Sequence, residues 1–170
     1  MLKLQSFILL FPLFLIFGCG DKLPPGMPKL YEAVLTITQD GSPLANANVL
    51  AISENYAAVP YSAGGQTDKS GNVRLLTEGK YKGIPAGKYI IAVSKTEAND
   101  IEKPATFNTE DEIKSYLAEV EKHSFVVVSE KFSDPEKSPL RLEVLKRKTT
   151  ATFDASPKVR LKPPTDTTKR

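Results

Sequence analysis

The fold is decided by residues 31–53, which read YEAVLTITQDGSPLANANVLAIS. β-Branched residues are frequent in 31–38, and small apolar side chains alternate with Asn46 and Asn48 in the second half, as in a half-buried strand. Between the two runs, Asp40-Gly41 is a strong turn signal because glycine accepts a positive φ. We therefore predict two strands, at 31–38 and 44–53, joined by a tight turn.

More short runs of the same kind follow along the chain. Each is bounded by Gly, Pro, Asn, Asp or Ser clusters, and the tightest of these is Asp68-Lys-Ser-Gly-Asn72. Several short strands separated by turns predict an all-β fold, a single Greek-key β-sandwich over residues 30–154. The runs lie at 73–77, 88–94, 125–129, 140–145 and 149–153.

One amphipathic helix is expected to interrupt the strands, near 109–122. Thr109 and Glu112 form a capping box, and three acidic residues occupy the first turn. The apolar residues that follow recur at i, i+3, i+4 and i+7, which makes one stripe. They are Ile113, Tyr116, Leu117 and Val120.

Three segments resemble the carboxypeptidase regulatory-like domain, a transthyretin-type, Ig-like β-sandwich. Residues 40–49 (DGSPLANANV) are similar to its DGxPLxGAxV segment, residues 65–73 (GQTDKSGNV) to GxTDxxGxF, and residues 84–93 (IPAGKYIIAV) to LPAGxYxVxV. The expected first-strand glycine is replaced by Val34 and Leu35, and the helix is an insertion. The resemblance implies an accessory or binding module without catalytic residues of its own. In the third segment we expect the Tyr89 ring to close the core while its hydroxyl reaches the rim.

The chain begins with a pattern typical of an export signal. Lys3 precedes an apolar core at 7–17 that is too short for a stable membrane span, and Cys19, the single cysteine of the chain, follows Gly18. Residues 16–19 resemble the lipobox of bacterial lipoproteins, although Phe17 stands where a small residue is commoner. The resemblance implies that residues 1–18 are removed and that Cys19 carries fatty acyl chains such as palmitate. An ordinary signal peptide cut nearby, or an uncleaved anchor, is the alternative.

Cleavage there would leave 170 − 18 = 152 residues and, with Lys3 lost, a net charge of +2 in place of +3. That length is enough for one domain with a modest core. Residues 19–29 are rich in Pro and Gly and form a tether. In some bacteria an Asp directly after the lipidated cysteine retains a lipoprotein in the inner membrane. Gly20 stands there, which favours the outer membrane, on its periplasmic side or its surface.

Candidate ligand-binding residues are few. Tyr56, Tyr61 and Tyr81 flank loops and could stack on a sugar or a peptide, or could cap the packing. Residues 68–72 only faintly resemble a calcium loop and are better explained as a turn. His123 is the single histidine, so no zinc site or catalytic triad is expected. The acidic residues of the helix are better explained as a solvated face than as a glycosidase pair. We expect no catalytic residue, metal or cofactor.

Basic residues are concentrated near the end of the chain. Residues 141–170 hold nine Lys or Arg and three Asp or Glu, a balance of +6. We expect residues 155–170 to be a disordered basic tail, either solubilising or in contact with anionic lipid, lipopolysaccharide or cell-wall polymer. Nucleic acid is not expected as a partner, because aromatic residues are not interleaved with the basic ones.

Together these features predict a lipid-anchored protein of the cell envelope. Its sandwich would be a non-enzymatic binding or structural module that engages carbohydrate or an envelope protein through its loops. A periplasmic accessory subunit or hydrolase is the alternative. Assembly through exposed strand edges is a third possibility.

Overall fold

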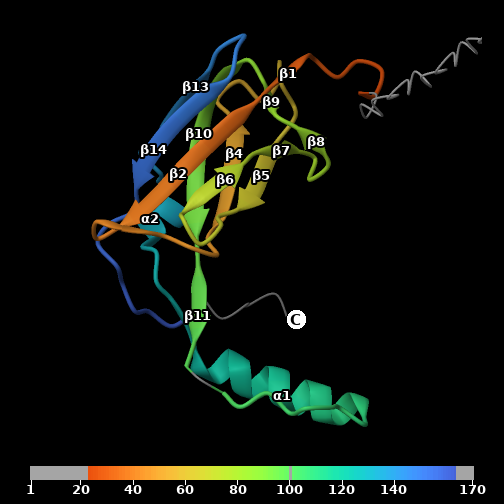
Figure 1. Ribbon diagram of the computed structural model, residues 1–170, viewed down its shortest axis with the longest axis vertical. Coiled ribbons are helices and arrows are strands. Elements are labelled where there is room, and N and C mark those ends of the chain that lie inside the picture. The colour runs from red at the N-terminus through yellow and green to blue at the C-terminus, as the bar shows by residue number, and fades with distance from the viewer. Residues whose placement is uncertain (1–22, 100, 164–170) are drawn as a thin grey trace, which may run out of the picture.

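A computed structural model describes residues 23–99 and 101–163, so the export signal and Cys19 lie outside the described residues. Within the described ranges the chain forms two helices and fourteen strands (Figure 1). The strands are β1 (Leu30–Tyr31), β2 (Ala33–Gln39), β3 (Ser42–Pro43), β4 (Asn48–Ser53), β5 (Ala63–Gln66), β6 (Asn72–Arg74), β7 (Leu76–Thr77), β8 (Tyr81–Lys82), β9 (Ile84–Pro85), β10 (Gly87–Ser94), β11 (Thr96–Ala98), β12 (Ser124–Val126), β13 (Arg141–Val144) and β14 (Thr149–Asp154). The helices are α1 (Glu110–His123) and α2 (Glu130–Ser133).

Two sheets face each other as a β-sandwich, as the sequence predicts. The larger has the order β13-β10-β4-β5-β7-β8, and the smaller has β2 at its centre, between β14 on one side and β3 and β6 on the other (Figure 1). β14 runs parallel to β2, with Thr149 opposite Ala33 and Asp154 opposite Thr38. The last strand of the sandwich therefore lies beside its first long strand.

The core between the sheets follows from period-two alternation. In β2 the buried positions alternate with half-buried ones, and Leu35 and Ile37 are fully buried. In β10 the same holds for Tyr89, Ile91 and Val93. Alternation places one side chain in two toward the opposite sheet, and burial of each large one contributes roughly 1.5–3 kcal/mol.

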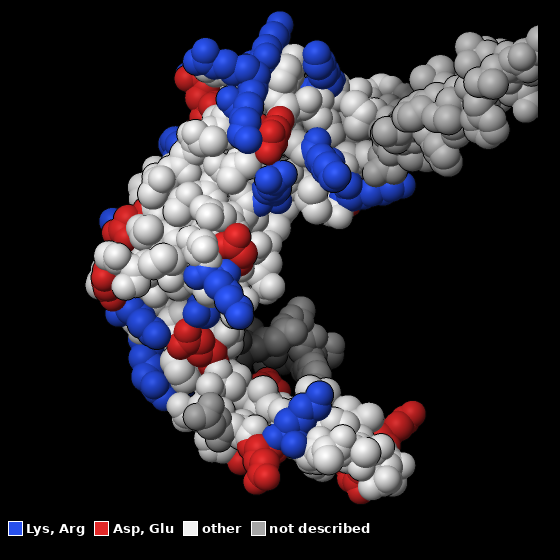
Figure 2. Space-filling view, in the orientation of Figure 1, with Lys and Arg blue, Asp and Glu red and all other residues white. Residues whose placement is uncertain are grey.

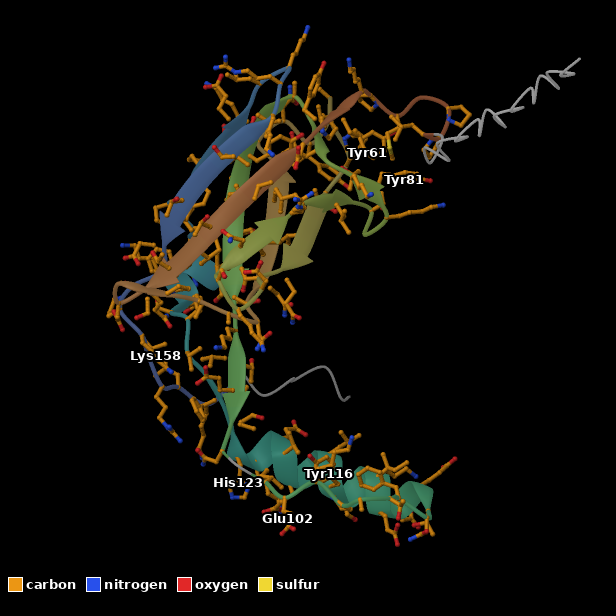
Figure 3. All side chains as sticks on the ribbon, viewed as in Figure 1. Tyr61, Tyr81, Glu102, Tyr116, His123 and Lys158 are labelled. Atoms are coloured by element: carbon orange, nitrogen blue, oxygen red, sulfur yellow. The ribbon has the colours of Figure 1, made fainter. Side chains whose placement is uncertain are left out.

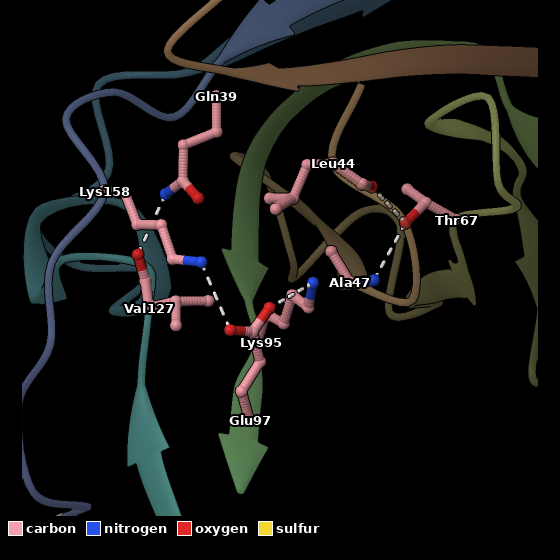
Figure 4. A network of polar contacts seen from close by, with 8 residues as sticks. All are labelled: Gln39, Leu44, Ala47, Thr67, Lys95, Glu97, Val127 and Lys158. Atoms are coloured by element: carbon pink, nitrogen blue, oxygen red, sulfur yellow. Dashed lines mark hydrogen bonds and ion pairs between the residues drawn. The ribbon is translucent and has the colours of Figure 1, made fainter. Parts of the chain in front are cut away.

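Two features shape the connection from β2 to β4: a hairpin turn at Asp40-Gly41 and a pair of hydrogen bonds made by Thr67. Asp40 and Gly41 both have positive φ, at 49° and 76°, which is the two-residue hairpin turn expected from the sequence. Further on, the Thr67 hydroxyl donates to the Leu44 carbonyl at 2.6 Å and accepts from the Ala47 N–H at 2.8 Å (Figure 4). These bonds satisfy the Leu44 carbonyl and the Ala47 N–H in the segment just before β4. β4 therefore begins at Asn48, four residues after the start of the predicted strand at residue 44.

The Asp68–Asn72 segment is a turn, as predicted. The Asp68 carboxylate accepts from the N–H groups of Ser70 and Asn72, at 2.8 and 2.9 Å. Gly71 has φ 74°, and a Cβ there would lie 2.4 Å from the Ile37 carbonyl oxygen, so only glycine fits.

Tyr89 corrects one expectation. Its side chain is fully buried, and its hydroxyl donates to the Pro85 carbonyl at 2.8 Å instead of reaching the rim. Burial raises the pKa of the hydroxyl to about 12. A buried hydroxyl needs a partner, and the chain supplies one four residues back.

Two predicted strands are shorter or divided. Residues 73–77 form β6 and β7, which pair with β2 and β5 and thus belong to different sheets, with Leu75 buried at the crossing. In 125–129, β12 ends at Val126 and the Ser129 hydroxyl caps α2. Over the described ranges, neither helix is long and apolar enough to cross a membrane.

Candidate functional site

A projection that we call the arm leaves the sandwich after β10. It consists of residues 95–126: β11 and β12 pair as a two-stranded ribbon, with Ala98 opposite Ser124, and α1 lies between them. Figure 1 shows α1 at the opposite end of the long axis from β1. The inserted helix of the sequence prediction is therefore outside the sandwich.

Local interactions define the ends of α1. The Thr109 hydroxyl accepts from the Glu112 N–H at 3.2 Å, as the capping box predicts. The Glu112 carboxylate accepts from the N–H of Asn108 at 2.7 Å, one residue before the expected donor. At the other end, Nδ1 of His123 lies 3.0 Å from the Glu119 carbonyl oxygen, which gives His123 a structural position in the last turn.

The apolar stripe of α1 is only partly covered. No residue of the helix is buried, and the side chains of Ile113 and Leu117 are 41% and 57% exposed. Tyr116 packs against Phe107, with the ring centres 5.4 Å apart, so the loop before the helix covers one flank. The other flank presents aliphatic side chains to solvent.

A groove of about 660 Å³ lies between this loop and the helix. Its lining combines apolar side chains with the acidic residues Asp111, Glu112 and Glu119, the last of which lies about two helical turns after Glu112. The apolar contributions are from Ile101, Pro104, Phe107 and Tyr116. Such a surface can bind an apolar group that carries a positive charge.

Residues 156–161, which we call the strap, fix the arm to the sandwich. Val126 and Leu161 exchange backbone hydrogen bonds of 2.8 and 3.1 Å. The Arg160 guanidinium lies 3.7 Å from the centre of the Phe125 ring and donates to Asn99 Oδ1 at 2.6 Å. This stacking of a cation on an aromatic face adds to the backbone pairing.

The strap corrects the prediction of a disordered tail for residues 155–161, while residues 164–170 of that predicted tail lie outside the described residues. Ala155 is fully buried, and its N–H donates to the Thr38 carbonyl at 2.9 Å. The Pro- and Lys-rich composition suggests disorder. The contacts that fix the strap, however, are with residues more than 30 positions earlier in the sequence. No local pattern reveals partners so distant.

Glu97 links the arm to the strap (Figure 4). Its carboxylate lies 2.6 Å from Lys95 Nζ and 3.2 Å from Lys158 Nζ. The hydrogen bond from Lys95, opposed by partial burial and reinforced by Lys158, lowers the pKa of Glu97. Nearby, the Gln39 amide donates to the carbonyls of Val127 and Ala155, at 2.9 and 3.2 Å.

The three candidate tyrosines lie on the sandwich, away from the arm. Tyr56 is exposed in the turn after β4, and Tyr81 lies in β8 with Lys80 Nζ 5.2 Å from its ring centre. Figure 3 places Tyr61 and Tyr81 at the same end of the molecule, with His123 and Tyr116 on the arm. Ligand binding by the tyrosines stays a prediction.

Charged side chains are distributed unevenly over the described surface (Figure 2). Lys146, Arg147 and Lys148 are exposed in the turn between β13 and β14.

In the described ranges, no group of three or more His, Cys, Asp or Glu side chains is placed to hold a metal ion.

Comparisons with known proteins do not show a family for this chain. No protein-family model matches the chain, and no curated protein matches it significantly. Among solved structures, a variant of BcpA, the major pilin subunit of Bacillus cereus, aligns over 75% of this chain with 12% identity and a TM-score of 0.38. This chain covers 30% of that pilin. The sandwich is therefore established by its own two sheets, and the kinship with carboxypeptidase regulatory-like domains stays a prediction.

Proposed function

We propose that the chain is a lipid-anchored protein of the bacterial cell envelope, and that its arm binds a partner protein. In this proposal the sandwich is a rigid, non-catalytic support. Cys19 is the attachment point, and the outer membrane is the favoured location because Gly20 follows it.

The observation that carries the proposal is the uncovered aliphatic face of α1. A helix with an apolar stripe normally buries it against the domain. Here Ile113 and Leu117 are exposed on a helix that the strap and ribbon hold in place. Exposed apolar surface rimmed by polar residues is typical of protein–protein contact sites.

The charge of the arm indicates the chemistry of the partner. α1 carries five acidic residues and two lysines, a balance of −3 with His123 neutral. A partner surface with an apolar centre and a Lys- or Arg-rich rim would complement it. Aliphatic side chains make poorer platforms for sugars than aromatic rings do, so the arm favours protein over carbohydrate.

Photocrosslinking in intact cells tests this proposal. A photoreactive phenylalanine analogue is placed at position 117 and, as a control, at position 50, since Leu50 on β4 is also an exposed leucine, at 40% against 57% for Leu117. We expect one discrete protein product at 117 and none at 50. The product should weaken with salt and disappear in an Ile113→Gln variant, because glutamine preserves helix propensity while it removes the apolar contact. Equal products at both positions would contradict the proposal.

The anchor is tested separately. We expect labelled fatty acid to be incorporated into the wild type and not into Cys19→Ala. Incorporation that persists in the variant, or a soluble exported wild type, would contradict lipidation at Cys19.

The alternative for a non-catalytic binding module is a carbohydrate ligand at the candidate tyrosines Tyr56, Tyr61 and Tyr81. Retention on cell-wall polymer that is lost in a Tyr61→Ala, Tyr81→Ala double variant, and kept in Ile113→Gln, would favour it over the arm. Hydrolysis of peptide or sugar substrates by the purified chain would instead favour the enzyme alternative.

A further inference from the structure

Strand β14 forms an open edge of the smaller sheet. It pairs with β2 on one side, and no strand in the described part of the chain lies on its other side. The Thr149 N–H donates to the Glu32 carbonyl at 2.9 Å, so Thr149 directs its backbone groups at β2. Because alternate residues of a parallel strand bond to the same neighbour, the backbone groups of Thr150 and Thr152 point away from β2.

The edge lacks proline, glycine and a bulge, which are among the usual protections of an edge strand. Its six residues contain no Pro or Gly, and the pairing with β2 continues over all six without a bulge. Ala151 and Phe153 face the core opposite Leu35 and Ile37, yet they are only half-buried, whereas Leu35 and Ile37 are fully buried. An added strand would bury the remaining apolar surface and satisfy the outward backbone groups.

We infer that β14 pairs in antiparallel fashion with β14 of a second copy of this chain, about a two-fold axis at Ala151. Residues 148–154 read KTTATFD, which is complementary to itself in that register. Thr150 lies opposite Thr152, and Lys148 lies opposite Asp154 twice, once on each side of the axis. Opposite-charge and Thr–Thr pairs directly across an antiparallel ladder are stabilising.

The charges favour antiparallel over parallel pairing and disfavour a shift of the register toward the C-terminus. A shift of two residues toward the C-terminus would place Asp154 opposite Thr150 and leave Lys148 without a carboxylate across the ladder. Parallel pairing would bring the basic turns at 146–148 of both copies together, which like-charge repulsion disfavours. Lys148 also lies 3.3 Å from Glu32 of its own chain, in an exposed ion pair, so it would contact two carboxylates in the dimer.

Anchoring at Cys19 is compatible with this dimer. The two-fold axis is perpendicular to the sheet, so the two N-terminal segments would stand at equal distances from a bilayer that faces the sheet. Attachment to one bilayer would also raise the effective concentration of each copy for the other. The inference does not depend on the arm or on its partner.

Charge exchange tests the pairing. Sedimentation of the full chain with Cys19→Ala should show a reversible dimer. Asp154→Lys should weaken the dimer about tenfold, because two attractive pairs become repulsive. The double variant Lys148→Asp, Asp154→Lys should restore it, since the same pairs re-form with their signs exchanged. Restoration excludes misfolding as the cause of the first loss.

Crosslinking tests the register. In the Cys19→Ala background, Ala151→Cys should form a disulfide-linked dimer on mild oxidation, because the two positions face each other at the axis. Thr36→Cys, on the central strand β2, should not form such a dimer.

A wild type that stays monomeric at every concentration, or a dimer unaffected by Asp154→Lys, would overturn the inference. So would crosslinking of position 151 in cells to a different protein, which would indicate that the edge takes a foreign strand. Ile113→Gln should leave the dimer intact, so failure here is distinct from failure of the arm proposal.

Discussion

The sandwich and the arm have equally clear apolar periodicity, yet only the sandwich buries it. In β2, Leu35 and Ile37 are fully buried, whereas no residue of α1 is. Periodicity therefore predicts the type of element but not what covers its apolar face. The strand is covered by other parts of the same chain, whereas the apolar stripe of the helix is only partly covered by the described residues.

Polar groups differ between the two regions in the same way. In the sandwich, Thr67 and Ser138 hydrogen-bond to backbone groups far along the chain; the Ser138 hydroxyl, for example, donates to the Ile91 carbonyl. In the arm, the bonds are local caps or exposed charged contacts such as Lys158–Glu97. Buried bonds are costly to remove, and exposed ion pairs contribute about 0–1 kcal/mol. The arm should therefore open well before the sandwich unfolds.

The largest difference between the two regions is expected in the free energy of unfolding, when a leucine is replaced by alanine in each of them. Leu35→Ala should lower the free energy of unfolding by about 2–5 kcal/mol, because it leaves a cavity in a closed core. Leu117→Ala should change it by less than about 0.5 kcal/mol, since the side chain is exposed and alanine suits a helix. Urea unfolding measures both. Similar losses for the two variants would mean that the α1 stripe is covered after all.

Substitution of two turn glycines by alanine tests whether steric contact adds to the cost of a positive φ in the sandwich. Gly71→Ala should cost about 2–4 kcal/mol, because a positive φ is combined with a Cβ only 2.4 Å from the Ile37 carbonyl oxygen. Gly79→Ala is the matched control: its φ is 66°, nothing lies within 4 Å of the added Cβ, and about 1 kcal/mol is expected. Thermal or urea unfolding compares them, and equal costs would remove the steric argument.

Tyr89 makes the stability of the sandwich depend on pH in the alkaline range. Its raised pKa of about 12 means that its stabilising effect is complete below its ordinary value of 10.0 and is lost as pH rises through about 12. Tyr89→Phe should cost about 1–3 kcal/mol at neutral pH, because the buried Pro85 carbonyl loses its donor. Its stability should then vary less between pH 10 and 12 than that of the wild type. A parallel decline in both proteins would assign the alkaline transition to another group.

The smallest effects are expected in the arm, at the acidic end. The pKa of Glu97 is lowered, so its contribution is present above the ordinary value of 4.5 and is lost as pH falls through the folded-state pKa. Glu97→Gln should change global stability by less than about 1 kcal/mol. It should still speed amide exchange in β11 and β12 at neutral pH, with the difference fading in acid.

Glu102→Gln is the control for this experiment. Glu102 lies on the arm, and the described residues include no ion pair to it. No change in exchange is expected. An equal change in both variants would mean that net charge, and not the contact with Lys95 and Lys158, holds the ribbon.

The sequence predicted the elements whose causes are local. The Asp40-Gly41 turn, the alternation of β2 and β10 and the Thr109 cap all depend on residues within a few positions of one another. The strap escaped prediction because Arg160 and Phe125 are separated by 35 residues, and no local pattern connects residues so far apart. The exposure of α1 escaped it because an apolar stripe has the same pattern whether it is covered or not.

Amide hydrogen exchange across the whole chain tests the contrast between sandwich and arm most directly. Exchange in β2, β4 and β10 should require global unfolding, while α1 should exchange through local opening, with protection lower by several orders of magnitude. If α1 exchanges only with the global unfolding of β2, then the sandwich stabilises the helix face, and the arm is not an independent binding element.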